Sequence, residues 1–244
     1  MLWCCTTRAA AGAPECSPPD EMKAKLHNEP SVEVLNDLGV WFADHEQYAC
    51  AADAFGSSLQ RDAAQPDLPH VVFEFGASLY LSGDTKEAIP SLQEAEKLGY
   101  RDEKIHVILA SAFDSERATL DAEAEWRMAL EFDQENTPAL DALSSDLLGQ
   151  GDFRATIDLL DTPRLGAQRS AQQTVNLGAA YAKTGRLEDA RRILEDGLNT
   201  NPESFDVAER LADVLTQLGR KDEAAMVMQL AELRRRQNAA QAGK

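Results

Sequence analysis

Small residues recur in this chain at a constant interval of 34 residues, in two parallel series. The first series comprises Ala110, Ser144, Gly178 and Ala212, and the second comprises Ala122, Thr156, Ala190 and Ala224. Both continue upstream, at Gly76 and Ala88 and then, after a three-residue insertion, at Gly39 and Ala51. A constant interval of this length indicates a helical hairpin repeated in tandem, in which each copy buries its apolar side against the next.

The residues around these small positions have the spacing of packed helices. Leu177 and Tyr181 lie four residues apart, as do Ala190 and Leu194, so each pair shares one helix face. Small residues let two helices approach closely, and the large residues fill the space opposite. A left-handed residue is expected to end the first helix of a hairpin. The glycines at this position are Gly83, Gly151, Gly185 and Gly219.

Three helix starts are expected from polar residues and prolines. Asp84 and Glu87 have the spacing of a capping box. Thr137 and Asn201 each precede a proline, a pattern in which the polar side chain caps the helix and the proline takes its first position.

The period is interrupted in two places. The residues AAQPDLP (63–69) form a longer loop between the first two copies. In the fourth copy the second helix should end near Asp161, because Pro163 follows it. We therefore expect an irregular segment at 161–170.

The segment 174–202 resembles the tetratricopeptide repeat. Its first-helix signature is Leu177, Gly178 and Tyr181, its second-helix residues are Ala190 and Leu194, and its closing proline is Pro202. About six copies can be placed in phase. The resemblance implies a right-handed α-solenoid of antiparallel helix hairpins, with a C-terminal capping helix. We expect a disordered or weakly ordered tail at 1–30, six repeats at 31–231, and the capping helix end and tail at 232–244.

The cysteines suggest no disulfide framework. Cys50 lies beside the small residue Ala51 and is interpreted as a semi-buried core thiol, so a reducing, cytoplasmic location is expected. The N-terminal segment lacks the basic start and apolar run of a secretory signal. No stretch approaches the ~18 apolar residues of a membrane span. Membrane attachment is expected only if Cys4 or Cys5 carries lipid.

Charge and motif content disfavour several classes of function. The formal net charge of −18 makes nucleic acid a poor partner, because phosphate binding needs a basic surface. The four histidines have no metal-ligand spacing, and no glycine-rich phosphate loop or nucleophile elbow is present. The sequence predicts neither an enzyme nor a bound metal or cofactor.

The family resemblance implies that the first helix of each copy lines a concave groove that binds partner peptides or proteins. The predicted groove residues are Phe73, Tyr80, Lys104, Val107, Ile108, Asn176, Lys183 and Arg210. Phe73 and Val107 have an alternative role in packing between neighbouring helices. A chaperone-type carboxylate clamp is disfavoured, because Asp141 and Asp206 stand where that clamp needs other residues and would repel a carboxylate.

The sequence thus predicts a scaffold or adaptor for protein–protein interaction. One alternative is a lipid-tethered assembly factor of an envelope or secretion machine. Another is a non-catalytic regulatory subunit of a separate enzyme. The sequence determines neither the partner nor the oligomeric state.

Overall fold

The structure is a computed structural model that describes residues 16–26 and 30–242. Helices and one short 3-10 turn, η1, are the regular elements of these residues, and the described part of the chain contains no strand. The elements are α1 Asp20–Leu26, α2 Val32–Asp44, α3 Tyr48–Arg61, α4 Leu68–Leu81, α5 Thr85–Lys97, α6 Glu103–Ser115, α7 Thr119–Phe132, α8 Thr137–Gln150, α9 Phe153–Leu160, η1 Gly166–Gln168, α10 Ala171–Lys183, α11 Leu187–Thr200, α12 Phe205–Gln217 and α13 Lys221–Ala242.

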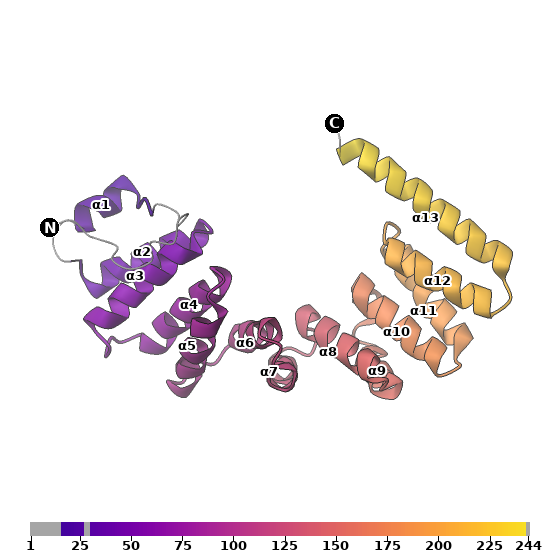
Figure 1. Ribbon diagram of the computed structural model, residues 1–244, viewed down its shortest axis with the longest axis horizontal. Helices are drawn as coiled ribbons and strands as arrows, with labels where there is room; N and C mark the ends of the chain where they lie inside the picture. Colours follow the sequence, from indigo (N-terminus) through magenta and orange to yellow (C-terminus); the bar gives the residue numbers. More distant parts are fainter. Residues whose placement is uncertain (1–15, 27–29, 243–244) are drawn as a thin grey trace. The chain divides into compact units, whose positions relative to one another are not determined.

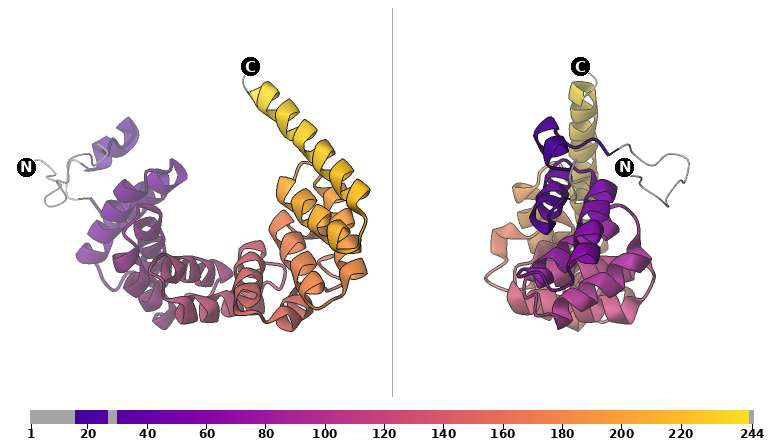
Figure 2. Two further views of the ribbon diagram at one scale, coloured as in Figure 1. Left: turned by 45° about the vertical axis from the view of Figure 1, so that its right-hand side comes forward. Right: turned by 90° about the vertical axis from the view of Figure 1, so that its left-hand side faces the viewer.

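The described helices from α2 onward follow one another in the order of six hairpins, as the repeat interval predicted. The pairs packed closely against each other are α2 with α3, α4 with α5, α8 with α9, α10 with α11, and α12 with α13. Figure 1 shows such pairs in α4 with α5 and in α10 with α11, and Figure 2 shows α12 beside α13. The chain divides into two compact units, the first ending at Glu125 and the second beginning at Trp126. Each unit has its own buried apolar clusters, so the core is a strip shared between neighbouring hairpins.

The turns inside the hairpins have the predicted backbone. Gly83, Gly151 and Gly219 have φ angles of 94°, 80° and 80°, in the left-handed region. Arg117 occupies the same position in the third hairpin and keeps this conformation without being glycine, with a φ of 61°. The hairpin geometry therefore imposes this turn even on a residue that pays a steric cost for it.

The small residues lie at close helix crossings, also as predicted. A Cβ atom added to Gly178 would stand 2.7 Å from Cγ of Leu194, and one added to Gly76 would stand 2.8 Å from Cγ of Leu92. Real Cβ atoms essentially never approach another heavy atom so closely. Glycine at these positions allows α10 to lie directly against α11, and α4 against α5.

The irregular segment after α9 is held in place by defined contacts. α9 ends at Leu160, as expected from Pro163. The guanidinium group of Arg169 then donates hydrogen bonds to the backbone carbonyls of Leu160 and Gly166, at 3.0 and 2.9 Å. Leu165 is buried against the core of the second unit. Residues 161–170 therefore lie outside the regular repeat pattern but are held in a defined position by specific contacts.

The predicted helix caps are partly wrong. Asp84 is the N-cap residue of α5, but its side chain makes no capping hydrogen bond, and the complete capping box belongs to Ser170 and Gln173. Asn136, one residue before Thr137, caps α8 by accepting from the backbone N–H of Ala139 at 3.0 Å. The capping patterns at these sites compete with neighbouring side chains, so sequence locates a helix start only to within a residue or so.

Asn201 does not start a helix. It is the C-cap residue of α11, and Pro202 lies in the turn that follows. α12 starts instead after Ser204, whose hydroxyl oxygen accepts from the backbone N–H of Val207. The Asn-Pro pair therefore ends one helix and does not begin the next.

The N-terminal part of the described chain is joined covalently to the first hairpin, contrary to expectation. Cys50 is buried, but it forms a disulfide with Cys16 and is not a free thiol. Met22 and Leu26 of α1 pack against the apolar cluster formed by α2, α3 and Val71 of α4. The sequence predicted a free thiol at Cys50, because a single disulfide bond produces no pattern of cysteine spacing that identifies it. The boundaries of the tail and the repeats remain predictions.

No helix in the part of the chain that the structure describes is both long enough and apolar enough to cross a membrane.

Candidate functional site

A hollow of about 720 Å³ opens where the first turns of α4 and α6 lie close together, within the first unit. We call it the α4–α6 hollow. Its walls come from the loop before α4, the first turns of both helices, and the loop before α6. The lining residues are Asp67, Pro69, His70, Phe73, Glu74, Gly99, Tyr100, Arg101, Asp102 and Lys104.

Local interactions fix the walls of this hollow. Asp102 caps α6 by accepting from the backbone N–H of Lys104 at 2.9 Å. Gly99, with a φ of 101°, allows the sharp turn after α5. Arg101 then donates to the backbone carbonyls of Glu96 and Tyr100, both at 2.8 Å, and so holds the loop in place.

Aromatic rings form one wall. The rings of Phe73 and Tyr100 are stacked, with centroids 4.2 Å apart and planes inclined by 9°. The ring of His70 stacks on Tyr100 at 6.0 Å. Phe73 is only 5% exposed, so it supports the wall from within the core, while Tyr100 is half-buried and His70 is exposed. Tyr100 and His70 therefore present the aromatic surface of the hollow to an incoming ligand.

The polar groups of the hollow carry both signs of charge. Burial raises the pKa of Glu74, although His70 and Lys104 oppose the shift. The side chains of His70 and Glu74 lie 3.6 Å apart. Burial, together with the charges of nearby carboxylates, raises the pKa of Tyr100 to about 12. At neutral pH Tyr100 is thus a neutral phenol that can donate a hydrogen bond.

The remaining predicted groove residues lie elsewhere. In the first unit, Tyr80 and Ile108 are half-buried and pack against the apolar cluster of α4 to α6, and Val107 is also half-buried. Of the eight predicted residues, the hollow brings together Phe73 and Lys104. It also contains Tyr100 and Arg101, which the sequence reasoning missed because they lie in a loop between repeats rather than on a first helix.

The three predicted residues of the second unit differ in availability. Asn176 is buried and donates to the hydroxyls of Ser144 and Ser145, at 2.8 and 3.1 Å, which links α10 to α8. Lys183 is exposed. Arg210 is half-exposed and lies 3.7 Å from the carboxylate of Asp213 on its own helix. Asn176 therefore serves packing, whereas Lys183 and Arg210 remain accessible.

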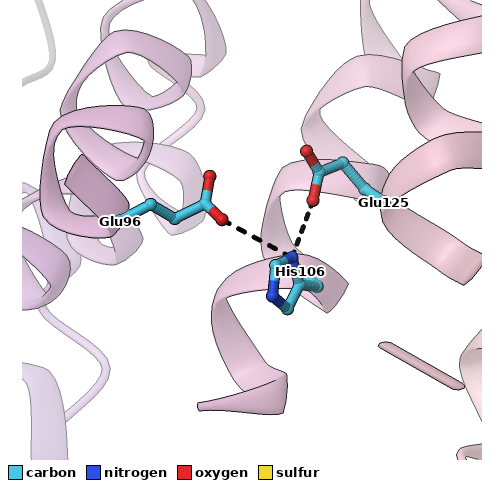
Figure 3. Close-up of side chains that lie close together, drawn as sticks. All are labelled: Glu96, His106 and Glu125. Carbon is cyan, nitrogen blue, oxygen red and sulfur yellow. Dashed lines mark hydrogen bonds and ion pairs between the residues drawn. The ribbon is translucent and has the colours of Figure 1, made fainter. Parts of the chain in front are cut away.

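A second polar cluster lies at the junction of α5, α6 and α7 (Figure 3). We call Glu96, His106 and Glu125 the Glu–His–Glu cluster. Nδ1 of His106 lies 2.8 Å from Oε2 of Glu125 and 3.8 Å from Oε1 of Glu96. Burial and the charge of Glu125 raise the pKa of Glu96, while His106 and Arg101 oppose the shift. No sequence spacing indicated this cluster, because each residue comes from a different helix.

The tandem hairpins, with small residues at their crossings and left-handed turns within each pair, define the chain as a helical repeat protein. Residues 182–244 match the family model described as tetratricopeptide repeat. A comparison with curated protein sequences found no significant match.

Solved structures of helical repeat proteins have the same fold. A tetratricopeptide repeat protein from Parabacteroides merdae ATCC 43184 is 17% identical, with a TM-score of 0.64 over 80% of this chain and 77% of that one. MamA from Desulfovibrio magneticus RS-1 is 18% identical, with a TM-score of 0.60 over 71% of this chain and 99% of that one. The corresponding values for YrrB are 15% and 0.59, over 78% and 97%. The chain thus has the fold of tetratricopeptide-repeat proteins, and residues 182–244 also match that family's model, in agreement with the resemblance seen in the sequence.

Proposed function

We propose that this chain is a protein-interaction scaffold that binds peptide segments of partner proteins, and that the α4–α6 hollow is one of its anchor sites. The observation that supports this function most is the hollow itself. It combines exposed aromatic surface on Tyr100 and His70 with Lys104 and Glu74 at its edge. Aromatic residues in a concave, partly desolvated setting are typical anchors of protein interfaces. YrrB, which has a similar fold, is a tetratricopeptide-repeat protein with an unusual peptide-binding site.

The charge of the hollow suits a peptide better than a nucleic acid. Three carboxylates line it, from Asp67, Glu74 and Asp102, beside the cations of Arg101 and Lys104. A phosphate chain would meet the carboxylates as well as the cations. A peptide offers backbone donors and acceptors and side chains of both charges, which match this mixture. We therefore propose that the partners are proteins or peptides and not nucleic acids. We further propose that the hollow binds them without a metal ion or cofactor and catalyses no reaction.

A displayed library of random peptides, selected on the purified chain, tests this proposal. Peptides that bind are measured by fluorescence anisotropy against Tyr100→Ala and Lys104→Glu variants. We expect each change to weaken binding at least ~10-fold, since anchor residues contribute about 2 kcal/mol or more. Lys86→Glu, an equal charge reversal on an exposed residue of α5, is the control and should leave affinity unchanged. Equal affinity in all variants would place the peptide site elsewhere.

A second function, the lipid-tethered assembly factor, is supported by the disulfide between Cys16 and Cys50. Disulfides persist in oxidising compartments and are rare in the cytosol, so this bond counts against the predicted cytoplasmic location. Cys4 and Cys5, the candidate lipid sites, lie outside the described residues. The intact mass of the natively expressed chain and its partition into detergent decide between the two. An unmodified mass with partition into the aqueous phase contradicts the tethered form.

The third hypothesis, a regulatory subunit of a separate enzyme, makes a different prediction. An activity would then copurify with the chain and be absent from the isolated protein.

A further inference from the structure

We propose that the Glu–His–Glu cluster binds a divalent transition-metal ion, of which Zn²⁺ is the best match. Three potential ligand atoms, one from each of Glu96, His106 and Glu125, lie within 4.8 Å of one another. They come from the end of α5, the first turn of α6 and the middle of α7, so an ion would join three consecutive helices, and all three ligand residues belong to the first unit.

The distances between the three ligand atoms would suit a metal ion after small movements of the side chains. Ligand atoms about 2.1 Å from a tetrahedral ion stand roughly 3.4 Å from each other. Nδ1 of His106 lies 2.8 Å from Glu125 and 3.8 Å from Glu96, on either side of that value. The two distances differ from it by about 0.6 and 0.4 Å, a change that small rotations of the glutamate side chains would supply. In Figure 3 both carboxylate groups are directed toward the same edge of the imidazole ring.

The Glu–His–Glu cluster is partly buried, as expected of a preorganised binding site. The side chain of His106 is 5% exposed and lies within the helix packing, which fixes the position of its ring. The side chains of Glu125 and Glu96 are 19% and 29% exposed, so an ion can enter from the carboxylate side. A buried imidazole flanked by two half-buried carboxylates would hold the ion by one nitrogen and at least two oxygens.

The donor set favours zinc-like ions over calcium or magnesium. Imidazole nitrogen suits Zn²⁺, Ni²⁺ and Cu²⁺, whereas Ca²⁺ and Mg²⁺ prefer ligand sets made of oxygen. Two ionised carboxylates balance the charge of a divalent ion. Arg101 attracts the Glu96 carboxylate, but in the described chain its guanidinium group forms its hydrogen bonds with backbone carbonyls.

The experiment is a zinc titration of the full chain at neutral pH, after removal of metal with EDTA. Free thiols are first alkylated, because Cys4 and Cys5 lie outside the described residues and could bind zinc themselves. Calorimetry is expected to give one site per chain that Mg²⁺ does not compete for. Co²⁺ at this site should give the visible absorption of a low-coordination complex, and Zn²⁺ should abolish it.

Variants locate the site. Glu96→Gln, Glu125→Gln and His106→Gln should each weaken zinc binding at least ~10-fold, since loss of a group that merely hydrogen-bonds a metal ligand already costs roughly 10–100-fold. His70→Gln is the matched control, because His70 also lies 3.6 Å from a carboxylate, that of Glu74, but belongs to no three-ligand group among the described residues. Circular dichroism checks the fold of each variant. If His106→Gln does not fold, Glu96→Gln, which changes a partly exposed side chain, still tests the site.

Two results overturn the proposal. One is weak binding of many zinc ions without saturation, which the net charge of −18 by itself would produce. The other is a single site whose affinity is unchanged in folded Glu96→Gln and Glu125→Gln. In either case the Glu–His–Glu cluster binds no metal ion and serves only to connect the three helices by hydrogen bonding. Because the peptide experiment uses different residues, its outcome is independent of this one.

Discussion

At the scale of single residues, glycines at helix crossings allow neighbouring helices to pack closely. Gly178 is buried, and the side chain of Leu194, itself fully buried, lies where its Cβ would be. Gly149 provides a contrast, since it also lies in a helix, α8, but apart from its own helix backbone no atom of the described residues lies within 4 Å of the place of its Cβ. The same residue type thus has opposite roles at two positions of one unit.

Gly178→Ala is expected to destabilise the chain by about 1 kcal/mol. Overpacking costs ~1–3 kcal/mol, and the better helix propensity of alanine returns about 1 kcal/mol of it. Gly149→Ala should instead stabilise by about 0.5 kcal/mol, because it gains propensity without a clash. Urea denaturation of both variants measures the difference. Equal effects of the two substitutions would contradict the close crossing of α10 and α11.

Glu74 gives a pH-dependent prediction at the same scale. Its pKa is raised above 4.5 in the folded protein, chiefly by burial, so the folded state binds a proton more tightly than the unfolded chain. The ionised carboxylate therefore costs stability above the raised pKa, and this cost disappears as the pH falls below 4.5. Glu74→Gln should raise the thermal midpoint at neutral pH and have less effect below pH 4.5. A destabilised variant at neutral pH would mean that the attraction of His70 and Lys104 outweighs burial.

At the scale of elements, the disulfide between Cys16 and Cys50 ties the segment before α1 to α3. It joins residues 34 apart in sequence, so it restricts the unfolded chain considerably. Around it, Met22 and Leu26 contact the apolar cluster of the first hairpin. The segment thus covers the end of the repeat stack with one covalent bond and a few apolar contacts.

Cys16→Ser is expected to lower the free energy of unfolding of the first hairpin by up to about 3–4 kcal/mol, the entropy of closing a loop of this length. Non-reducing peptide mapping first checks that the wild-type bond is formed. Thermal denaturation with and without reductant then gives the stability difference. Wild-type protein should lose stability on reduction, whereas Cys16→Ser should not respond. A wild type indifferent to reductant would show that the bond does not contribute.

At the scale of the whole molecule, each unit has its own apolar clusters. In helical repeats the stability is close to a sum of hairpin terms and contacts between neighbours. A local defect should therefore remain local.

Hydrogen exchange of Gly178→Ala tests this property. We expect faster exchange in α10, α11 and the hairpins beside them, and unchanged protection in α2 to α5. Gly149→Ala serves as the control and should leave exchange in α10 and α11 as it is or slower. Uniformly faster exchange along the chain would indicate a single cooperative unit.

Much of the fold could be predicted from the sequence because its information is local and repeated. The interval of 34 residues predicted the hairpins, the left-handed turns at Gly83 and Gly151, and the close crossings at Gly76 and Gly178. Each of these features depends on a few residues of one hairpin. The sequence did not identify the capping residues correctly, because Asn136 lies next to Thr137, and Ser204 lies within one turn of Asn201. Each of these side chains is able to cap a helix.

The candidate sites depend instead on contacts between elements. Phe73 and Tyr100 meet because α4 lies beside the loop that leads into α6, and His106 meets two glutamates because three helices converge. Cys16 reaches Cys50 because α1 folds back on the first hairpin. The sequence by itself determined a stack of helical hairpins, since periodic spacing defines helix faces. Only the tertiary structure decided which side chains of different hairpins meet, because that depends on packing between elements and has no signature in linear spacing.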